Sequence, residues 1–128
     1  MRAARRRILC VEDHEDTCLM LTTLFGGQGY EVVSAGGVVE AVGLAGAGRF
    51  DLYGLDVSLP DGSGLELCAR LRVIDPGAEI IFYSGAAYER DRVVGLAMGA
   101  SAYVTKPGVG ELLKTVAGLL GGAAGTTP

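Results

Sequence analysis

The chain has 128 residues, the size of one domain, which is enough to bury a single hydrophobic core without disulfide or metal staples. Its composition, 49% hydrophobic and 20% charged, excludes extensive disorder. The net charge of −4 is unevenly distributed, because Arg2, Arg5, Arg6 and Arg7 lie in the first seven positions. The rest of the chain has seven basic and fifteen acidic residues, a charge of −8. Nucleic-acid binding requires Lys and Arg to neutralise phosphates, so we expect no direct contact with nucleic acid.

Short apolar runs alternate along the chain with longer segments of helical periodicity, the pattern of a parallel sheet with crossover helices. The predicted strands are, in chain order, Ile8–Val11, Tyr30–Ala35, Leu52–Asp56, Glu79–Ser84 and Ala102–Thr105. The predicted helices are Asp16–Gln28, Val38–Ala47, Leu65–Val73, Glu89–Met98 and Val109–Leu120. We therefore predict an α/β fold, a single doubly wound (βα)5 domain with helices on both faces of a five-stranded sheet.

Two details of this assignment concern packing. Leu19, Leu21, Leu24 and Phe25 recur at near-helical spacing, which predicts an apolar stripe on the first helix. Gly54 is unexpected inside the third strand, because glycine there either weakens the strand or permits a close approach of another backbone. The sequence leaves both explanations of Gly54 open.

The cysteines indicate the compartment. Cys10, Cys18 and Cys68 have no C-x-x-C spacing, so neither a disulfide framework nor a zinc site is indicated, and a reducing setting fits best. No apolar run reaches the ~18 residues of a membrane span, and the arginine-rich N-terminus lacks the apolar stretch of a secretion signal. We expect a cytoplasmic protein without a membrane span.

Polar residues gather where the predicted strands end. Glu12 and Asp13 follow the first strand, Asp56 ends the third, Ser84 ends the fourth, and Lys106 follows the fifth. Ligand sites of open α/β sheets lie beyond the carboxyl ends of the strands. We therefore expect three acids, one hydroxyl and one of only two lysines to meet at one edge of the sheet.

This group of residues suggests a specific chemistry. Crowded carboxylates repel one another, so a cation is expected among them, and oxygen ligands suit Mg²⁺. An aspartate beside such a cation can attack a phosphoryl group to give an acyl phosphate, while the metal and a lysine neutralise the phosphoryl oxygens. The constellation predicts a phosphoaspartate site with Asp56 as the nucleophile.

At these residues the sequence resembles the receiver domain of two-component response regulators. The resemblance spans residues 7–120 and is carried by "ILCVEDHED", "DLYGLDVSLPDGSGLEL", "IIFYSGAA" and "GASAYVTKPGVGELL". It implies a chemotaxis-regulator-like fold with strand order 2-1-3-4-5. The receiver domain is then residues 7–120, preceded by residues 1–6 as the basic arm. The remaining segment, residues 121–128, is short and rich in small residues, which predicts a flexible tail.

The resemblance assigns roles to the strand-end residues. It implies a phosphoacceptor, a phosphate-contacting lysine and two switch residues, which are Asp56, Lys106, Ser84 and Tyr103. It implies Mg²⁺ or Mn²⁺ held by Glu12, Asp13, Asp56 and the backbone carbonyl of Ser58. A cis peptide bond is implied before Pro107.

The implied function is phosphorelay signal transduction. A sensor histidine kinase or a histidine phosphotransfer protein would supply the phosphoryl group to Asp56. The surface formed by the fourth helix, the fifth strand and the fifth helix would then switch toward an output partner. We therefore expect a regulatory phosphoacceptor domain and not an enzyme. Tyr53 and Gly54 depart from the family, which has bulky aliphatic residues there.

The sequence also bears on three alternative functions. A haloacid-dehalogenase-type phosphatase requires a second acid where Ser58 stands, and a flavodoxin-like flavin carrier requires a hydroxyl- and glycine-rich loop in place of "VEDHED". A receiver fold used only for docking, without phosphorylation, stays open. We expect His14 to be a solvated loop residue, because Mg²⁺ prefers oxygen, and Asp61 to be an ordinary turn residue.

Overall fold

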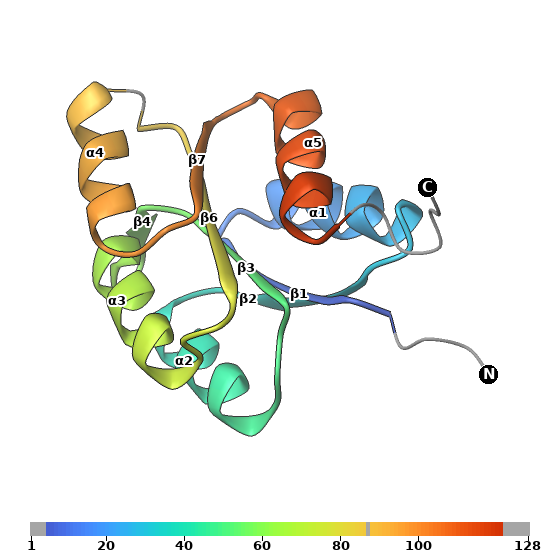
Figure 1. Ribbon diagram of the computed structural model, residues 1–128, viewed down its shortest axis with the longest axis horizontal. Coiled ribbons are helices and arrows are strands. Elements are labelled where there is room, and N and C mark those ends of the chain that lie inside the picture. Colours follow the sequence, from blue (N-terminus) through green and yellow to red (C-terminus); the bar gives the residue numbers. More distant parts are fainter. Residues whose placement is uncertain (1–4, 87, 122–128) are drawn as a thin grey trace.

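A computed structural model describes residues 5–86 and 88–121, which form a central sheet between two layers of helices (Figure 1). Five parallel strands make the sheet: β1 (Arg7–Val11), β2 (Glu31–Ala35), β3 (Leu52–Leu55), β6 (Glu79–Ser84) and β7 (Ala102–Thr105). Their order is β2-β1-β3-β6-β7, which confirms the predicted order 2-1-3-4-5. Residues 1–4 of the predicted arm and 122–128 of the predicted tail lie outside the described residues.

The helices divide between the two faces of the sheet. One face carries α1 (Glu15–Gly27) and α5 (Val109–Leu119), and the other carries α2 (Val38–Ala47), α3 (Gly64–Ile74) and α4 (Glu89–Ala97) (Figure 1). Each face has its own hydrophobic cluster, to which alternate residues of the strands contribute. Leu9 points toward α2 and α3, whereas Ile8 points toward α1 and α5. Burial on both faces explains why β1 and β6 have nearly continuous apolar sequences.

Two details differ from the sequence predictions. A short antiparallel hairpin, β4 (Ser58–Leu59) and β5 (Gly62–Ser63), lies between β3 and α3. Strands of two residues are too short to give a periodic signal, so this hairpin was not predicted. The inward position of Leu19 was wrong, since its side chain is 68% exposed and the buried residues of α1 are Leu21 and Phe25. Two residues correspond to about 200° of helix rotation, which places Leu19 opposite Leu21.

All three cysteines are free thiols, and burial raises the pKa of Cys10 to about 12. In the described ranges, no helix combines the length and apolarity needed to cross a bilayer.

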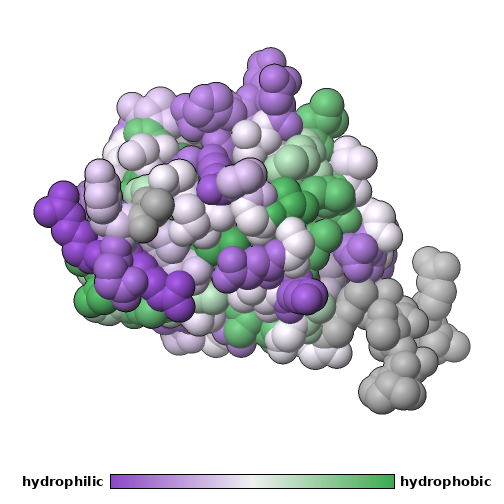
Figure 2. Space-filling view, turned by 90° about the horizontal axis from the view of Figure 1, so that it is seen from above, coloured by the Kyte–Doolittle hydropathy of each residue, from purple (hydrophilic) through white to green (hydrophobic). Residues whose placement is uncertain are grey.

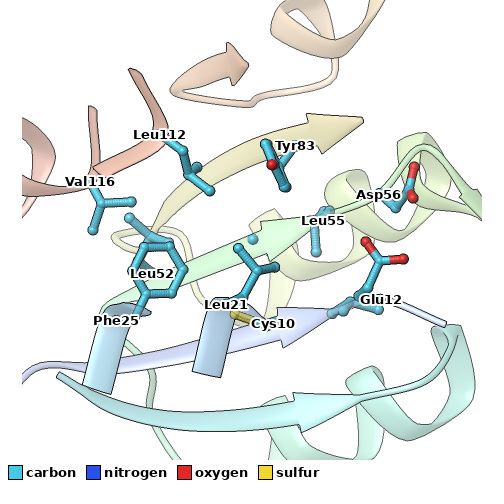
Figure 3. A pocket seen from close by; sticks show the side chains of 12 residues that line it. Cys10, Glu12, Leu21, Phe25, Leu52, Leu55, Asp56, Tyr83, Leu112 and Val116 are labelled. Carbon is cyan, nitrogen blue, oxygen red and sulfur yellow. The ribbon is translucent and has the colours of Figure 1, made fainter. Parts of the chain in front are cut away.

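Gly54 borders a small cavity. It pairs in register with Cys10 and Ile81, both of which belong to the cluster under α1 and α5. A Cβ atom at Gly54 would meet no other atom within 4 Å. The cavity, shown in Figure 3, has a volume of about 10 Å³ and lies among mainly apolar side chains, including Phe25 and Leu112. Gly54 therefore leaves a gap in the packing, and no backbone approaches it closely.

Replacing Gly54 with alanine is expected to raise the free energy of unfolding by about 0.5–1 kcal/mol. The added methyl group would occupy empty space, and alanine loses less backbone entropy on folding than glycine. Urea denaturation measures the effect, with the exposed helical Gly118→Ala as a control, because a Cβ at Gly118 also meets nothing within 4 Å. A loss of stability in Gly54→Ala but not in Gly118→Ala would contradict the presence of empty space beside Gly54.

Candidate functional site

The sheet brings the predicted polar residues together at its carboxyl edge. Backbone hydrogen bonds continue the sheet pattern one residue past the strands: the N–H of Glu12 donates to Ala35, that of Asp56 to Val11, and that of Lys106 to Ser84, at 2.9, 3.2 and 2.8 Å. These bonds fix the backbone at each strand end. Figure 3 shows the Glu12 and Asp56 side chains just beyond the arrowheads of β1 and β3.

Lys106 bridges the two buried acids of this edge. Its Nζ donates to Glu12 Oε1 at 2.8 Å and to Asp56 Oδ2 at 3.0 Å. The Glu12 and Asp56 side chains are only 2% and 12% exposed, so both carboxylates depend on this ammonium for charge compensation. Burial lowers the pKa of Lys106, but the hydrogen bonds to Glu12 and Asp56 outweigh that effect and raise the pKa above its usual value.

Ser84 holds the other oxygen of Asp56. Its hydroxyl donates to Asp56 Oδ1 at 2.9 Å and accepts a bond from the N–H of Ala86 at 3.2 Å. The N–H of Ser58 lies 3.4 Å from the same Oδ1. Asp56 is thus held at both carboxylate oxygens, by a lysine on one and a hydroxyl on the other.

The predicted metal-binding acids follow β1. Glu12, Asp13 and His14 each offer a ligand atom, and these atoms lie within 4.8 Å of one another. Asp13 is exposed, with its Oδ1 3.7 Å from His14 Nδ1. His14 is 75% exposed, as expected for a solvated loop residue, although its Nδ1 also lies 3.4 Å from Glu12 Oε2. Carboxylate oxygens at a partly open edge fit the preference of Mg²⁺ for one or two carboxylates and several waters.

Tyr103 points into the protein and is buried. Its hydroxyl donates to the carbonyl of Ala86 at 2.6 Å, and its ring lies 5.7 Å from that of Phe82. Burial raises the pKa of Tyr103. Gly95 of α4 lies against both rings, since a Cβ there would stand 3.1 Å from each. Tyr103 therefore connects the loop after β6, which carries Ala86, to the underside of α4.

The segment after β7 is also fixed by side chains. The peptide bond between Lys106 and Pro107 is cis, the geometry that the resemblance implies. The hydroxyl of Tyr83 donates to the carbonyl of Pro107 at 3.2 Å, and its ring lies 5.7 Å from Lys106 Nζ. The sequence did not indicate this role of Tyr83, because there it is one more apolar residue of a buried strand.

Asp61 makes contacts outside its own turn. Its carboxylate accepts hydrogen bonds from the backbone N–H groups of Val38 and Val39 at 2.6 and 3.0 Å. These are the first two residues of α2, which lie more than twenty residues earlier in the chain. The interpretation of Asp61 as only a turn residue was therefore wrong, and no local sequence signal marks this contact.

Comparisons with known proteins agree with this fold. The family model of the response regulator receiver domain matches residues 8–117. The DNA-binding response regulator MtrA of Mycobacterium tuberculosis is 35% identical over 107 residues, which are 84% of this chain and 46% of MtrA. The response regulator TrrA of Thermotoga maritima, solved in complex with Mg²⁺ and BeF, is 31% identical with a TM-score of 0.81, over 89% of this chain and 98% of that one.

A further solved relative carries the modification predicted for this site. A response regulator of Burkholderia pseudomallei, whose structure contains a phosphorylated aspartic acid and a calcium ion, is 33% identical with a TM-score of 0.80, over 84% of this chain and 64% of that one. The present chain belongs to the receiver domain family of two-component response regulators. It spans less than half the length of the curated relatives that it matches.

Proposed function

We propose that Asp56 accepts a phosphoryl group from the phosphohistidine of a sensor kinase or a histidine phosphotransfer protein. The observation that carries this proposal is the fixation of the Asp56 carboxylate by Lys106 at 3.0 Å and Ser84 at 2.9 Å. A carboxylate oxygen attacks phosphorus, a C–O–P linkage forms, and the N–P bond breaks with its electron pair going to the imidazole nitrogen. Relatives with a phosphorylated aspartate or with Mg²⁺ and BeF support the same chemistry here.

The surrounding residues have separate roles in this proposal. Lys106 neutralises a phosphoryl oxygen while it stays near Asp56. Ser84 redirects its hydroxyl from Asp56 to the phosphoryl group. Glu12, Asp13, Asp56 and the Ser58 carbonyl would hold Mg²⁺ or Mn²⁺, and such an ion would supply further positive charge beside the phosphoryl oxygens. The oxygen-rich donor set after β1 supports this metal assignment.

The proposed output surface consists of α4, β7 and α5. Phosphorylation at Asp56 acts on it through Ser84, Ala86 and Tyr103, which form a continuous chain of hydrogen bonds and packing up to Gly95 of α4. Figure 2 shows hydrophilic side chains gathered at the left edge of the molecule, over α4. The exposed α4 residues also include Val93, Val94 and Leu96. Such a mixed surface suits a protein partner.

Membership of the family also suggests where the domain acts and what kind of partner it contacts. We propose that residues 7–120 act as a cytoplasmic receiver domain that contacts protein partners. The DNA-binding role in the name of MtrA belongs to a protein more than twice as long as the matched region. The acidic body of this chain, with fifteen acidic residues, favours protein contacts over DNA contacts.

Treatment with acetyl phosphate or phosphoramidate and Mg²⁺ is expected to add one phosphoryl group, seen by intact-mass measurement. Asp56→Asn should give no adduct, because an amide lacks the nucleophilic carboxylate. The same adduct in Asp56→Asn would refute the assignment of Asp56. No adduct on the wild-type protein would favour a receiver fold used only for docking.

A further inference from the structure

The β4–β5 hairpin connects the strand end at Asp56 to α2. Its base lies beside Asp56, since the N–H of Gly64 donates to the Val57 carbonyl at 2.7 Å and β4 pairs with β5 through Ser58 and Ser63. Its tip reaches α2 through Asp61. The hairpin therefore lies between the site and a helix from an earlier part of the chain.

Asp61 supplies the cap that α2 lacks. The N-cap position of α2 is Gly37, which has no side chain to accept a hydrogen bond. Both carboxylate oxygens of Asp61 fill that role, one on the N–H of Val38 and one on the N–H of Val39. These hydrogen bonds, first that from Val39 and then that from Val38, lower the pKa of Asp61. Asp61 therefore stays ionised at neutral pH, where its charge also suits the helix N-terminus.

Two glycines make room for the contact between Asp61 and α2. A Cβ atom at Gly37 would lie 2.5 Å from Asp61 Oδ1, so only glycine leaves room for the carboxylate. Gly62, at φ +157°, lies against α2 as well, since its Cβ would stand 3.1 Å from Val38 Cγ2. Val38 is buried in the hydrophobic cluster of that face, so the tip of the hairpin is fastened to a packed part of the fold.

We propose that Asp61 is a positioning residue that fastens the hairpin to α2 and so holds Ser58 in place for the divalent cation. This inference rests on the proposed metal site, of which the Ser58 carbonyl is one ligand. Ser58 is in β4, three residues from Asp61, and its pairing with Ser63 makes the hairpin one unit. Without Asp61, the tip would be released and the Ser58 backbone would become less well ordered for metal binding.

The test is the affinity of the full chain for Mg²⁺ alone, measured by calorimetry without a phosphoryl donor. Asp61→Ala is expected to weaken Mg²⁺ binding by about tenfold, at the low end of what loss of a residue that orients a metal ligand costs. Ser63→Ala is the matched control. Ser63 is in the same hairpin, but its hydroxyl caps α3 by accepting a bond from the N–H of Leu65, so its loss leaves the link to α2 intact.

A double variant separates fastening from simple helix capping. Serine is a favoured N-cap residue, and in Asp61→Ala the space beside Gly37 is open, so Gly37→Ser can cap α2 locally. The double variant Gly37→Ser with Asp61→Ala is expected to recover thermal stability while Mg²⁺ binding stays weak. Recovery of Mg²⁺ affinity together with stability would show that Asp61 is only a helix cap, which would overturn the proposal.

Equal Mg²⁺ affinities for wild type and Asp61→Ala, or an equal loss in Ser63→Ala, would refute the positioning role of Asp61 while leaving the phosphoacceptor function in place. Failure of the wild-type chain to bind Mg²⁺ would refute the proposed metal site and, with it, the positioning role of Asp61.

Discussion

Lys106→Ala is expected to slow phosphoryl incorporation at Asp56 by about 10²- to 10³-fold, the usual loss when one preorganised donor is removed from a site where charge develops. Lys106 Nζ is within 3.0 Å of both Asp56 and Glu12. In the variant, these two buried carboxylates lose the cation that compensates them. The rate is measured by intact mass over time with acetyl phosphate at saturating Mg²⁺.

The variant should also lose about 1–3 kcal/mol of stability in the absence of metal, because hydrogen bonds to charged groups are removed from a largely buried position. Added Mg²⁺ should recover more stability in Lys106→Ala than in wild type, since the ion can replace the missing positive charge. The pKa of Lys106 is raised in the folded protein. Its contribution to the free energy of unfolding is therefore fully present below the unfolded pKa of about 10.4 and is lost as the pH rises through the folded pKa.

The chain contains a matched control for these measurements. Lys114 is the other lysine of the sequence and lies exposed on α5. Lys114→Ala removes the same charge and should leave both the rate and the stability near wild type. A rate for Lys106→Ala within threefold of that for Lys114→Ala would refute the role of Lys106.

The sequence predicted the fold and which strand-end residues meet at the candidate site, because both depend on patterns that are local in the chain. β1 and β6 are buried on both faces and therefore have long apolar runs. Gly29 and Gly99, at φ +92° and +109°, directly follow the predicted ends of the first and fourth helices. Residues at strand ends meet at one edge for topological reasons. The contact of Lys106 with Glu12, ninety-four residues apart, could thus be anticipated.

Contacts that depend on the exact path of a loop could not be predicted. The amides that Asp61 caps belong to α2, and nothing near Asp61 in the chain indicates that α2 begins beside it. The hairpin that carries Asp61 has strands of two residues. Gly54 shows a different limit, since the sequence could not tell a close backbone approach from an empty space, and the structure has the empty space.

Gly64→Ala is expected to be the most destabilising of the glycine substitutions, by about 1–3 kcal/mol or more. Gly64 is the first residue of α3 and is buried. A Cβ atom there would overlap the carbonyl oxygen of Asp56 and would stand 3.0 Å from the Cα of Val57. Both neighbours are backbone atoms, which cannot rotate away as a flexible side chain can, so the chain at Asp56 must move.

This movement should affect the site as well as stability. Asp56 is held within hydrogen-bonding distance of Ser84 and Lys106, and a shift of its backbone lengthens both contacts. We therefore expect Gly64→Ala to lower both the urea midpoint and the yield of the phosphoryl adduct. Gly43→Ala, in an open position of α2, should instead raise stability by up to about 1 kcal/mol. Wild-type stability in Gly64→Ala would mean that α3 does not start against the backbone of Asp56.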